Sequence, residues 1–180
     1  MKKNSSLPLN RLTLLSLYAA LIYVSVAALK IPVGPQFIHI GNALVVIALL
    51  LFGFNQGFVA SALGLAIFDI LGGYASTFWI ITLETLVVAV LVSYLHERCF
   101  KDKLTTKNLF IIALAAAISK IIVNLLRYTI MGMVVSNLPF AAATTAALVK
   151  ITGTFGTAIV TVVVVPILYP VFKRMLNRVL

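Results

Sequence analysis

The stretch Lys120–Tyr128 reads KIIVNLLRY and places two cations and an amide inside a long apolar segment. Lys120, Asn124 and Arg127 are spaced i, i+4 and i+7, so a helix presents all three side chains along one stripe. The rest of the chain decides what surrounds that helix, and therefore what the polar stripe faces.

The composition of the whole chain indicates a membrane protein. It has 180 residues, of which 62% are hydrophobic and 10% charged, and its mean hydropathy is +1.15. A soluble domain of this size cannot bury so much apolar surface, whereas a lipid bilayer solvates it. The length predicts a single domain over residues 1–180. Cys99 is the only cysteine, so an intrachain disulfide is excluded.

Apolar runs of membrane length alternate with short breaks that contain glycine, proline or charge. Six such runs cover about 11–29, 39–53, 57–72, 77–95, 108–132 and 140–172. The last run is too long for one crossing, and Pro166 and Pro170 predict that its final turns kink or leave the lipid. We therefore predict an all-α integral membrane protein, a six-transmembrane-helix bundle.

The distribution of lysine and arginine predicts the orientation of this bundle. Lys30 stands alone in the loops of one side, and the other side receives ten cations: Lys2, Lys3, Arg11, Arg98, Lys101, Lys103, Lys107, Lys173, Arg174 and Arg178. Short cytoplasmic loops are the ones enriched in such residues. Both termini are therefore predicted to be cytoplasmic, in a multi-pass protein of the cell membrane. The net charge of +10 reflects this topology and not a nucleic-acid partner.

Five ionisable residues fall inside the predicted spans: Asp69, Glu84, Lys120, Arg127 and Lys150. An ionised side chain at the centre of a bilayer costs roughly 2.5–3.5 kcal/mol on insertion scales. Counting residues along each helix places all five in the middle or outer half of the membrane. This arrangement predicts a polar cavity that opens to the outside and is closed below by apolar packing.

Two explanations of these charges compete. In the first, Asp69 and Glu84 neutralise cations as buried pairs that only hold helices in register. In the second, the charges line a pocket for a small polar molecule. The second is favoured because three cations meet two anions, and because further polar groups surround them: Asn124, Thr154, Thr157 and Thr161.

The predicted outer loops add aromatic side chains above the polar region. The segment GPQFIHIGN supplies Phe37, His39 and Asn42, and GGYASTFW supplies Tyr74 and Trp79. Trp79 suits an interfacial belt as well as it suits stacking on a ligand, and a single histidine such as His39 is commonly structural. Aromatic faces above a polar pocket nevertheless favour a flat heteroaromatic ligand.

Motifs for catalysis, metals and nucleotides are missing from the sequence. His39 and His96 fall on opposite sides of the predicted membrane, which leaves no metal-ligand cluster. The segment KITGTFG, beginning at Lys150, lacks the order of a phosphate-binding loop. We predict a protein that is not an enzyme, has no cofactor and cannot itself hydrolyse ATP; an intramembrane enzyme is the third-ranked class.

Small residues follow one face of the first predicted helix. Ser16, Ala20 and Ala27 lie near this face and allow a neighbouring helix to approach closely. Such a face serves either packing within the protein or docking of another membrane protein.

The segment from His39 to Tyr74 resembles the substrate-binding S components of energy-coupling factor (ECF) vitamin transporters. The matching features are H-x-G-N at His39–Asn42, F-G-x-x-x-G at Phe52–Gly57 and D-x-x-x-G-Y at Asp69–Tyr74. The chain looks most like the family typified by riboflavin, hydroxymethylpyrimidine and pyridoxine binders. One departure is the segment TFWIITLETL, where Thr82 and Glu84 replace a lysine and glycines of many relatives.

The resemblance implies partners and a site. Such S components bind a vitamin from outside, associate with a membrane scaffold (T) subunit and two cytoplasmic ATPase subunits, and topple in the membrane to release their cargo. The resemblance thus implies that the face of Ser16, Ala20 and Ala27 contacts a partner subunit. The predicted binding residues are charged or hydrogen-bonding groups and an outer lid with a stacking surface: Glu84, Lys120, Asn124, Arg127, Lys150, Phe37, His39, Asn42, Tyr74 and Trp79.

The identity of the ligand stays open at the level of sequence. Pyridoxine or hydroxymethylpyrimidine suits a pocket that mixes an acid, amides and aromatic rings. The three cations also make the anion pantothenate a candidate, and riboflavin is a further one. The alternative from another class is a structural or assembly membrane protein whose charges only pair internally.

Overall fold

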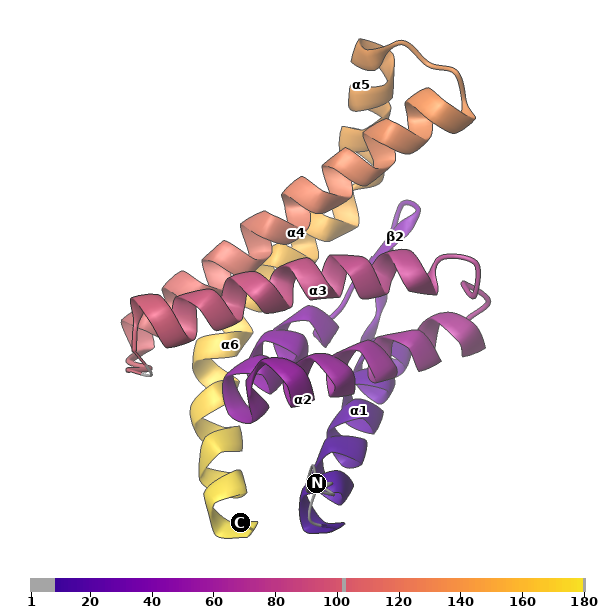
Figure 1. The fold of residues 1–180 in the computed structure, drawn as a ribbon. Coiled ribbons are helices and arrows are strands. Elements are labelled where there is room, and N and C mark those ends of the chain that lie inside the picture. Colours follow the sequence, from indigo (N-terminus) through magenta and orange to yellow (C-terminus); the bar gives the residue numbers. More distant parts are fainter. Residues whose placement is uncertain (1–8, 102, 180) are drawn as a thin grey trace, which may run out of the picture.

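The computed structural model describes residues 9–101 and 103–179, and these residues are almost entirely helical (Figure 1). Lys2 and Lys3, which enter the topology prediction, lie outside the described residues. The elements in chain order are α1 (Leu9–Leu29), β1 (Ile31–Val33), β2 (Gln36–Ile38), α2 (Gly41–Leu71), α3 (Phe78–Tyr94), the π-helical turn η1 (Leu95–Cys99), α4 (Thr106–Val135), α5 (Phe140–Lys150) and α6 (Thr152–Val179).

Five helices in the described part of the chain are long and apolar enough to cross a membrane, and α5 is a shorter apolar helix. This confirms the predicted all-α membrane class. The spans predicted at 11–29, 77–95 and 108–132 correspond to α1, α3 and α4. The start of α1 and the end of α6 lie at the same end of the molecule in Figure 1, while their cytoplasmic location stays a prediction.

The second and third predicted spans form the two halves of α2, which reverses its direction at Gly53. Gly53 has φ 76° and ψ 178°, a conformation in the region that favours glycine. A Cβ atom on Gly57 would lie 2.7 Å from Leu49 Cα, whereas eight residues of straight helix separate two atoms by about 12 Å. The loop predicted over 53–57 is therefore wrong: a single residue makes the turn, and the helical halves 41–52 and 54–71 pack closely beside it.

The sixth predicted span, 140–172, is not one helix. α5 ends at Lys150, Ile151 leaves the helical conformation with φ −87° and ψ 14°, and α6 begins at Thr152. α6 then continues through Pro166 and Pro170 to Val179. Its 28 residues span about 42 Å at 1.5 Å per residue, which exceeds the ~30 Å hydrocarbon core of a bilayer.

The apolar core surrounds the first half of α2, which packs against α1, and it continues through residues of α3, α4 and α6. Ile22 on α1 is fully buried, and so is Ile47 on α2. A Cβ atom on Gly64 would lie 2.5 Å from the Ala19 carbonyl oxygen, so glycine is required for α2 to approach the backbone of α1. The Tyr18 hydroxyl donates to the Leu44 carbonyl at 2.9 Å and satisfies the polar end of this buried ring.

A short antiparallel hairpin follows α1 and extends from the helical body (Figure 1). β1 pairs with β2 in the register Ile31↔Ile38 and Val33↔Gln36. Gly34 at the turn has φ 58°, which glycine adopts without strain. β2 packs against α6, so this hairpin brings Gln36 and Phe37 over the helices that carry the polar stripe.

Candidate functional site

A cavity of about 250 Å³ lies beneath the hairpin, between α2, α3, α4 and α6. Four of the five ionisable residues that the sequence places inside the membrane line it: Asp69, Glu84, Lys120 and Arg127. The cavity is partly open, and carboxylate, ammonium, guanidinium, amide and hydroxyl groups converge on it. Clefts of this kind, with a few placed polar groups, are typical of small-molecule sites.

The carboxylate of Glu84 joins two cations of α4. Lys120 Nζ lies 2.5 Å from Glu84 Oε2, and Arg127 Nη1 lies 3.0 Å from Glu84 Oε1. The Glu84 side chain is only 3% exposed, and those of Lys120 and Arg127 are 14% and 16% exposed. The three residues form one charge triad that ties α3 to α4, with one positive charge in excess.

A chain of hydrogen bonds continues from α4 to the hairpin. Asn124 Nδ2 donates to Thr154 Oγ1 at 3.3 Å, and Thr154 Oγ1 donates to Gln36 Oε1 at 2.8 Å. The backbone N–H of Thr154 also donates to Gln36 Oε1, at 2.9 Å. The same N–H also donates to the Ile151 carbonyl at 2.9 Å, so Gln36 adds a second acceptor at the start of α6, where α5 ends.

Two further contacts fix β2 on α6. Thr157 Oγ1 donates to the Phe37 carbonyl at 3.2 Å and accepts from the backbone N–H of His39 at 3.3 Å. A Cβ atom on Gly156 would collide with the side chain of Ile38, so a residue larger than glycine would force that side chain to move. The hairpin is thus held to α6 along its second strand.

His39 lines the cavity as a neutral ring. Its Nδ1 accepts a hydrogen bond from the backbone N–H of Gly41 at 3.1 Å, which leaves the proton on Nε2. Burial lowers the pKa of His39 to about 4, and the positive charge of Lys120 lowers it further in the same direction. The imidazole therefore contributes no charge to the cavity at neutral pH.

Aromatic rings gather at the upper part of the cavity wall. The ring centroids of Phe37 and Tyr74 lie 6.2 Å apart with an edge-on orientation, and those of Phe68 and Tyr74 lie 6.2 Å apart in a stacked one. Lys30 Nζ lies 4.9 Å from the centre of the Phe37 ring and 5.0 Å from that of Phe68. The rings provide apolar faces suited to a flat ligand.

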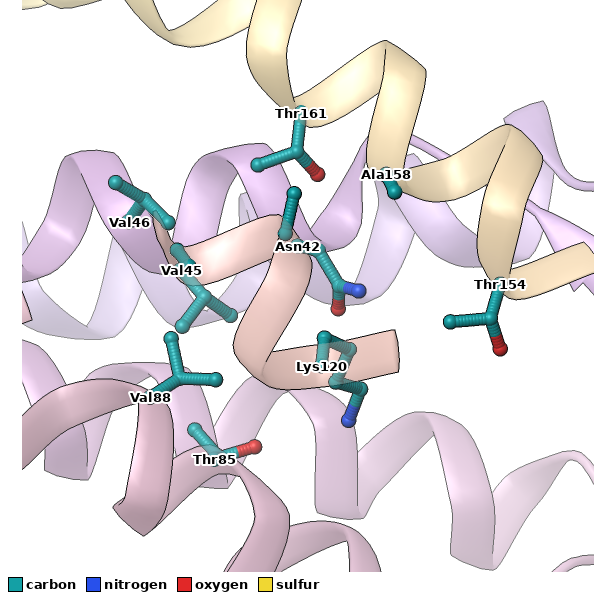
Figure 2. A pocket seen from close by; sticks show the side chains of 11 residues that line it. Asn42, Val45, Val46, Thr85, Val88, Lys120, Thr154, Ala158 and Thr161 are labelled. Atoms are coloured by element: carbon teal, nitrogen blue, oxygen red, sulfur yellow. The ribbon is translucent and has the colours of Figure 1, made fainter. Parts of the chain in front are cut away.

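A second, smaller hollow of about 20 Å³ adjoins the main cavity and shares Asn42, Lys120 and Thr154 with it. Figure 2 shows these side chains together with Val45, Val88 and other mostly apolar neighbours of the hollow. This volume accommodates about one water molecule or one small substituent. Lys120 of the charge triad thus borders a hollow whose lining mixes valine and alanine side chains with polar ones.

The structure brings most of the predicted binding residues together. Those that line the main cavity are Phe37, His39, Asn42, Tyr74, Glu84, Lys120, Asn124 and Arg127. Two others lie outside its lining. Trp79 is 53% exposed and its indole N–H donates to the Ser76 carbonyl, while Lys150 is exposed at the end of α5, with Nζ 5.8 Å from the centre of the Tyr128 ring.

Lys150 is the last residue of α5, and the predicted sixth helix is interrupted directly after it, at Ile151. Its Nζ lies 5.8 Å from the centre of the Tyr128 ring, and its depth in the membrane stays a prediction. The observed α5 ends at Lys150 and leaves its side chain exposed. The cavity lining consequently contains two cations and not three.

Some lining residues were absent from the predicted set, among them Gln36, Asp69, Thr77 and Tyr128. Asp69 was recognised as an intramembrane charge, and Gln36 and Tyr128 directly adjoin predicted residues, so proximity in sequence was the available signal. Thr154 and Thr157, expected as surrounding polar groups, do line the cavity. No cluster of three or more side chains suited to a metal ion forms within residues 9–101 and 103–179.

The predicted docking face on α1 is partly accessible. Ser16 and Ala20 are exposed, while Ala27 is half-buried against the apolar core. An accessible pair of small residues one helical turn apart is compatible with close approach of another helix.

A comparison with protein families identifies the chain. The family model for the ECF-type riboflavin transporter S component matches residues 6–174. Neither the curated proteins nor the solved structures gave a match. The chain belongs to this S component family, and it is therefore a multi-pass membrane protein that binds a vitamin substrate for an ECF transporter. Its family consists of transport proteins that act with the ECF membrane and ATPase module, not of enzymes.

Proposed function

We propose that this S component captures a small heteroaromatic vitamin or vitamin precursor, pyridoxine or hydroxymethylpyrimidine, in the cavity beneath the hairpin. The observation that supports this choice is one cavity lined by a charge triad, an amide and aromatic rings. Its volume of about 250 Å³ lies just below the roughly 300–1,000 Å³ of sites for drug-sized ligands. A ligand with a single ring suits that size.

In this proposal the polar and the aromatic residues of the cavity have different roles. Lys120, Arg127 and Asn124 donate hydrogen bonds to ring nitrogens and hydroxyl oxygens of the ligand, while Glu84 keeps both cations in position. Phe37 and Tyr74 contact the faces of the ring, as the outer lid. Trp79 acts as an interfacial anchor instead of a binding residue, consistent with its exposure.

Riboflavin is the second candidate, because the matching family model is described by that vitamin. Its three fused rings and ribityl chain need more space than a single-ring ligand. If riboflavin is the ligand, we expect the aromatic upper wall to move and the small hollow of Figure 2 to be occupied as well. The anion pantothenate is disfavoured relative to the sequence-based prediction because Lys150 does not line the cavity.

We further propose that the protein works in a prokaryotic plasma membrane with one scaffold (T) subunit and two cytoplasmic ATPase subunits. Ser16 and Ala20 on α1 form the contact with the scaffold, and Ala27 supports this face from within. ATP hydrolysis by the partners then drives release of the vitamin inward, with the S component toppling in the membrane.

The test is a thermal-shift screen of the full-length protein in detergent against pyridoxine, hydroxymethylpyrimidine, riboflavin and pantothenate. A ligand that binds the folded state raises the melting temperature, and one present at about 100 times its Kd stabilises by about 2.7 kcal/mol. We expect pyridoxine or hydroxymethylpyrimidine to give the largest shift. An internally paired assembly protein would show no shift with any of the four, and that result would overturn the proposal.

A further inference from the structure

Asp69 differs from the other acid in the cavity. Its residue is 5% exposed, it lines the cavity, and its Oδ2 is buried without a hydrogen-bond partner. Glu84, in contrast, uses both of its oxygens in the charge triad. A buried carboxylate oxygen without a partner is costly, and a donor supplied from the cavity removes that cost.

The charges that line the cavity balance formally. Among its described lining residues, Asp69 and Glu84 carry two negative charges, and Lys120 and Arg127 carry two positive ones. Lys30 and Lys150 lie behind rings of the cavity wall, outside the lining itself. Within the lining, a ligand with a net charge therefore finds no excess charge of the opposite sign.

Several unused donors line the cavity, and those that carry a positive charge lie on α4. Lys120 and Arg127 each donate one described hydrogen bond, both to Glu84. An ammonium group has three N–H donors and a guanidinium group has five, so several remain for a ligand. The cavity thus offers surplus charged donors on α4 and, on α2, a charged acceptor with an unpaired oxygen.

From this asymmetry we infer that Asp69 is a specificity-determining residue, which accepts a hydrogen bond from an N–H or O–H group of a ligand with no net charge. The inference rests on the proposed function and narrows it. The ligand presents a donor to Asp69 on α2 and acceptors to Lys120 and Arg127 on α4. Anionic forms of the same ring or chain are excluded, because they bring negative charge toward a carboxylate that has a free oxygen.

The first experiment compares neutral and anionic partners on the unmodified full-length protein. Isothermal titration in detergent uses three matched pairs: pyridoxine and 4-pyridoxic acid, pantothenol and pantothenate, and riboflavin and its 5′-phosphate. In any pair that binds, we expect the neutral member to bind at least tenfold more tightly. Equal or tighter binding of the anionic member overturns the inference, although it leaves the proposed vitamin binding intact.

The second experiment replaces the carboxylate. With the tightest neutral ligand of that series, Asp69→Asn should weaken binding by about tenfold or more, as expected for the loss of a hydrogen bond to a charged group. Glu97→Gln is the matched control: it removes one carboxylate from the exposed turn η1, outside the cavity lining, and should leave the affinity unchanged. An unchanged affinity of Asp69→Asn overturns the role of Asp69.

The outcomes distinguish failure of the proposed vitamin binding from failure of the inferred role of Asp69. If neither hydroxymethylpyrimidine nor any member of the three pairs binds the unmodified protein, the proposed function fails, and the inference fails with it. If Asp69→Asn does not fold, as judged by its melting curve, the comparison of neutral and anionic ligands on the unmodified protein still tests the inferred preference for a ligand with no net charge.

Discussion

Replacement of Glu84 by glutamine is the sharpest test of the charge triad. The substitution preserves the shape of the side chain but removes the only negative charge in contact with Lys120 and Arg127 among the described residues. Both cations keep limited access to water, with 14% and 16% of their side chains exposed. We therefore expect a loss at the lower end of the range for a broken buried pair, about 3 kcal/mol.

Replacement of Lys120 by methionine should cost much less. It leaves Glu84 paired with Arg127, removes the excess positive charge and preserves an apolar chain of similar length. We expect a loss of about 1 kcal/mol, the size of one hydrogen bond. At roughly 2–4 °C per kcal/mol, Glu84→Gln lowers the melting temperature by about 6–12 °C and Lys120→Met by about 2–4 °C.

The double variant Glu84→Gln with Lys120→Met distinguishes a charge triad from two separate contacts. Because Lys120→Met removes one of the cations that Glu84→Gln leaves unpaired, the double variant should unfold at a higher temperature than Glu84→Gln alone. The assay is thermal unfolding of the detergent-purified protein, with Glu97→Gln as a control for loss of a carboxylate outside the cavity. If the two single variants lower the melting temperature equally and the double variant lowers it by their sum, the contacts are independent and the charge triad is refuted.

Four other changes have specific expected outcomes. Ala117→Leu fills the small hollow and should weaken riboflavin binding about tenfold in a titration but leave the binding of a single-ring ligand unchanged, while the melting temperature falls by only a few degrees. Gly153→Val should displace the hairpin and abolish binding at ligand concentrations that saturate the unmodified protein, because a Cβ atom there would lie 2.7 Å from Gln36 Cβ and 3.3 Å from the hairpin backbone. Ser16→Leu with Ala20→Leu should leave binding intact but reduce ATP-driven uptake in vesicles at least tenfold. Burial lowers the pKa of His39 to about 4, so between about pH 4 and 6.5 the unfolded chain binds more protons than the folded one. The melting temperature should therefore fall as the pH drops through that window, and His39→Gln should reduce this fall.

The polar stripe could be predicted from sequence because the periodicity of a helix is a local property. Lys120, Asn124 and Arg127 were expected on one face, and all three line the same cavity. Their partner was not predictable in the same way. Glu84 lies 36 residues from Lys120 and 43 from Arg127, and only the packing of α3 against α4 determines that one carboxylate contacts both cations.

The break between α5 and α6 shows where hydropathy gives insufficient information. The segment 140–172 is apolar throughout, so its composition predicts one long helix. The observed interruption at Ile151 coincides with a contact from a distant part of the chain, since Gln36 accepts hydrogen bonds from both the backbone and the side chain of Thr154. Lys150 is the last residue before this interruption, is exposed there and does not line the cavity.

The intramembrane charges can pair with one another and also line a ligand site, although the sequence presents these as competing explanations. The Glu84 triad is an internal pair of the kind expected for a purely structural protein, and it holds α3 against α4. Pairing alone, however, requires neither a void of about 250 Å³ beside the pair nor a buried acid with a free oxygen in the same wall. In lipid, such a void would be closed by apolar side chains unless something polar occupied it, because exposed polar walls cost free energy. In the proposed function, the triad positions the donors of Lys120 and Arg127 by holding them against Glu84, and the vitamin would complete the polar network that the chain leaves unfinished at Asp69.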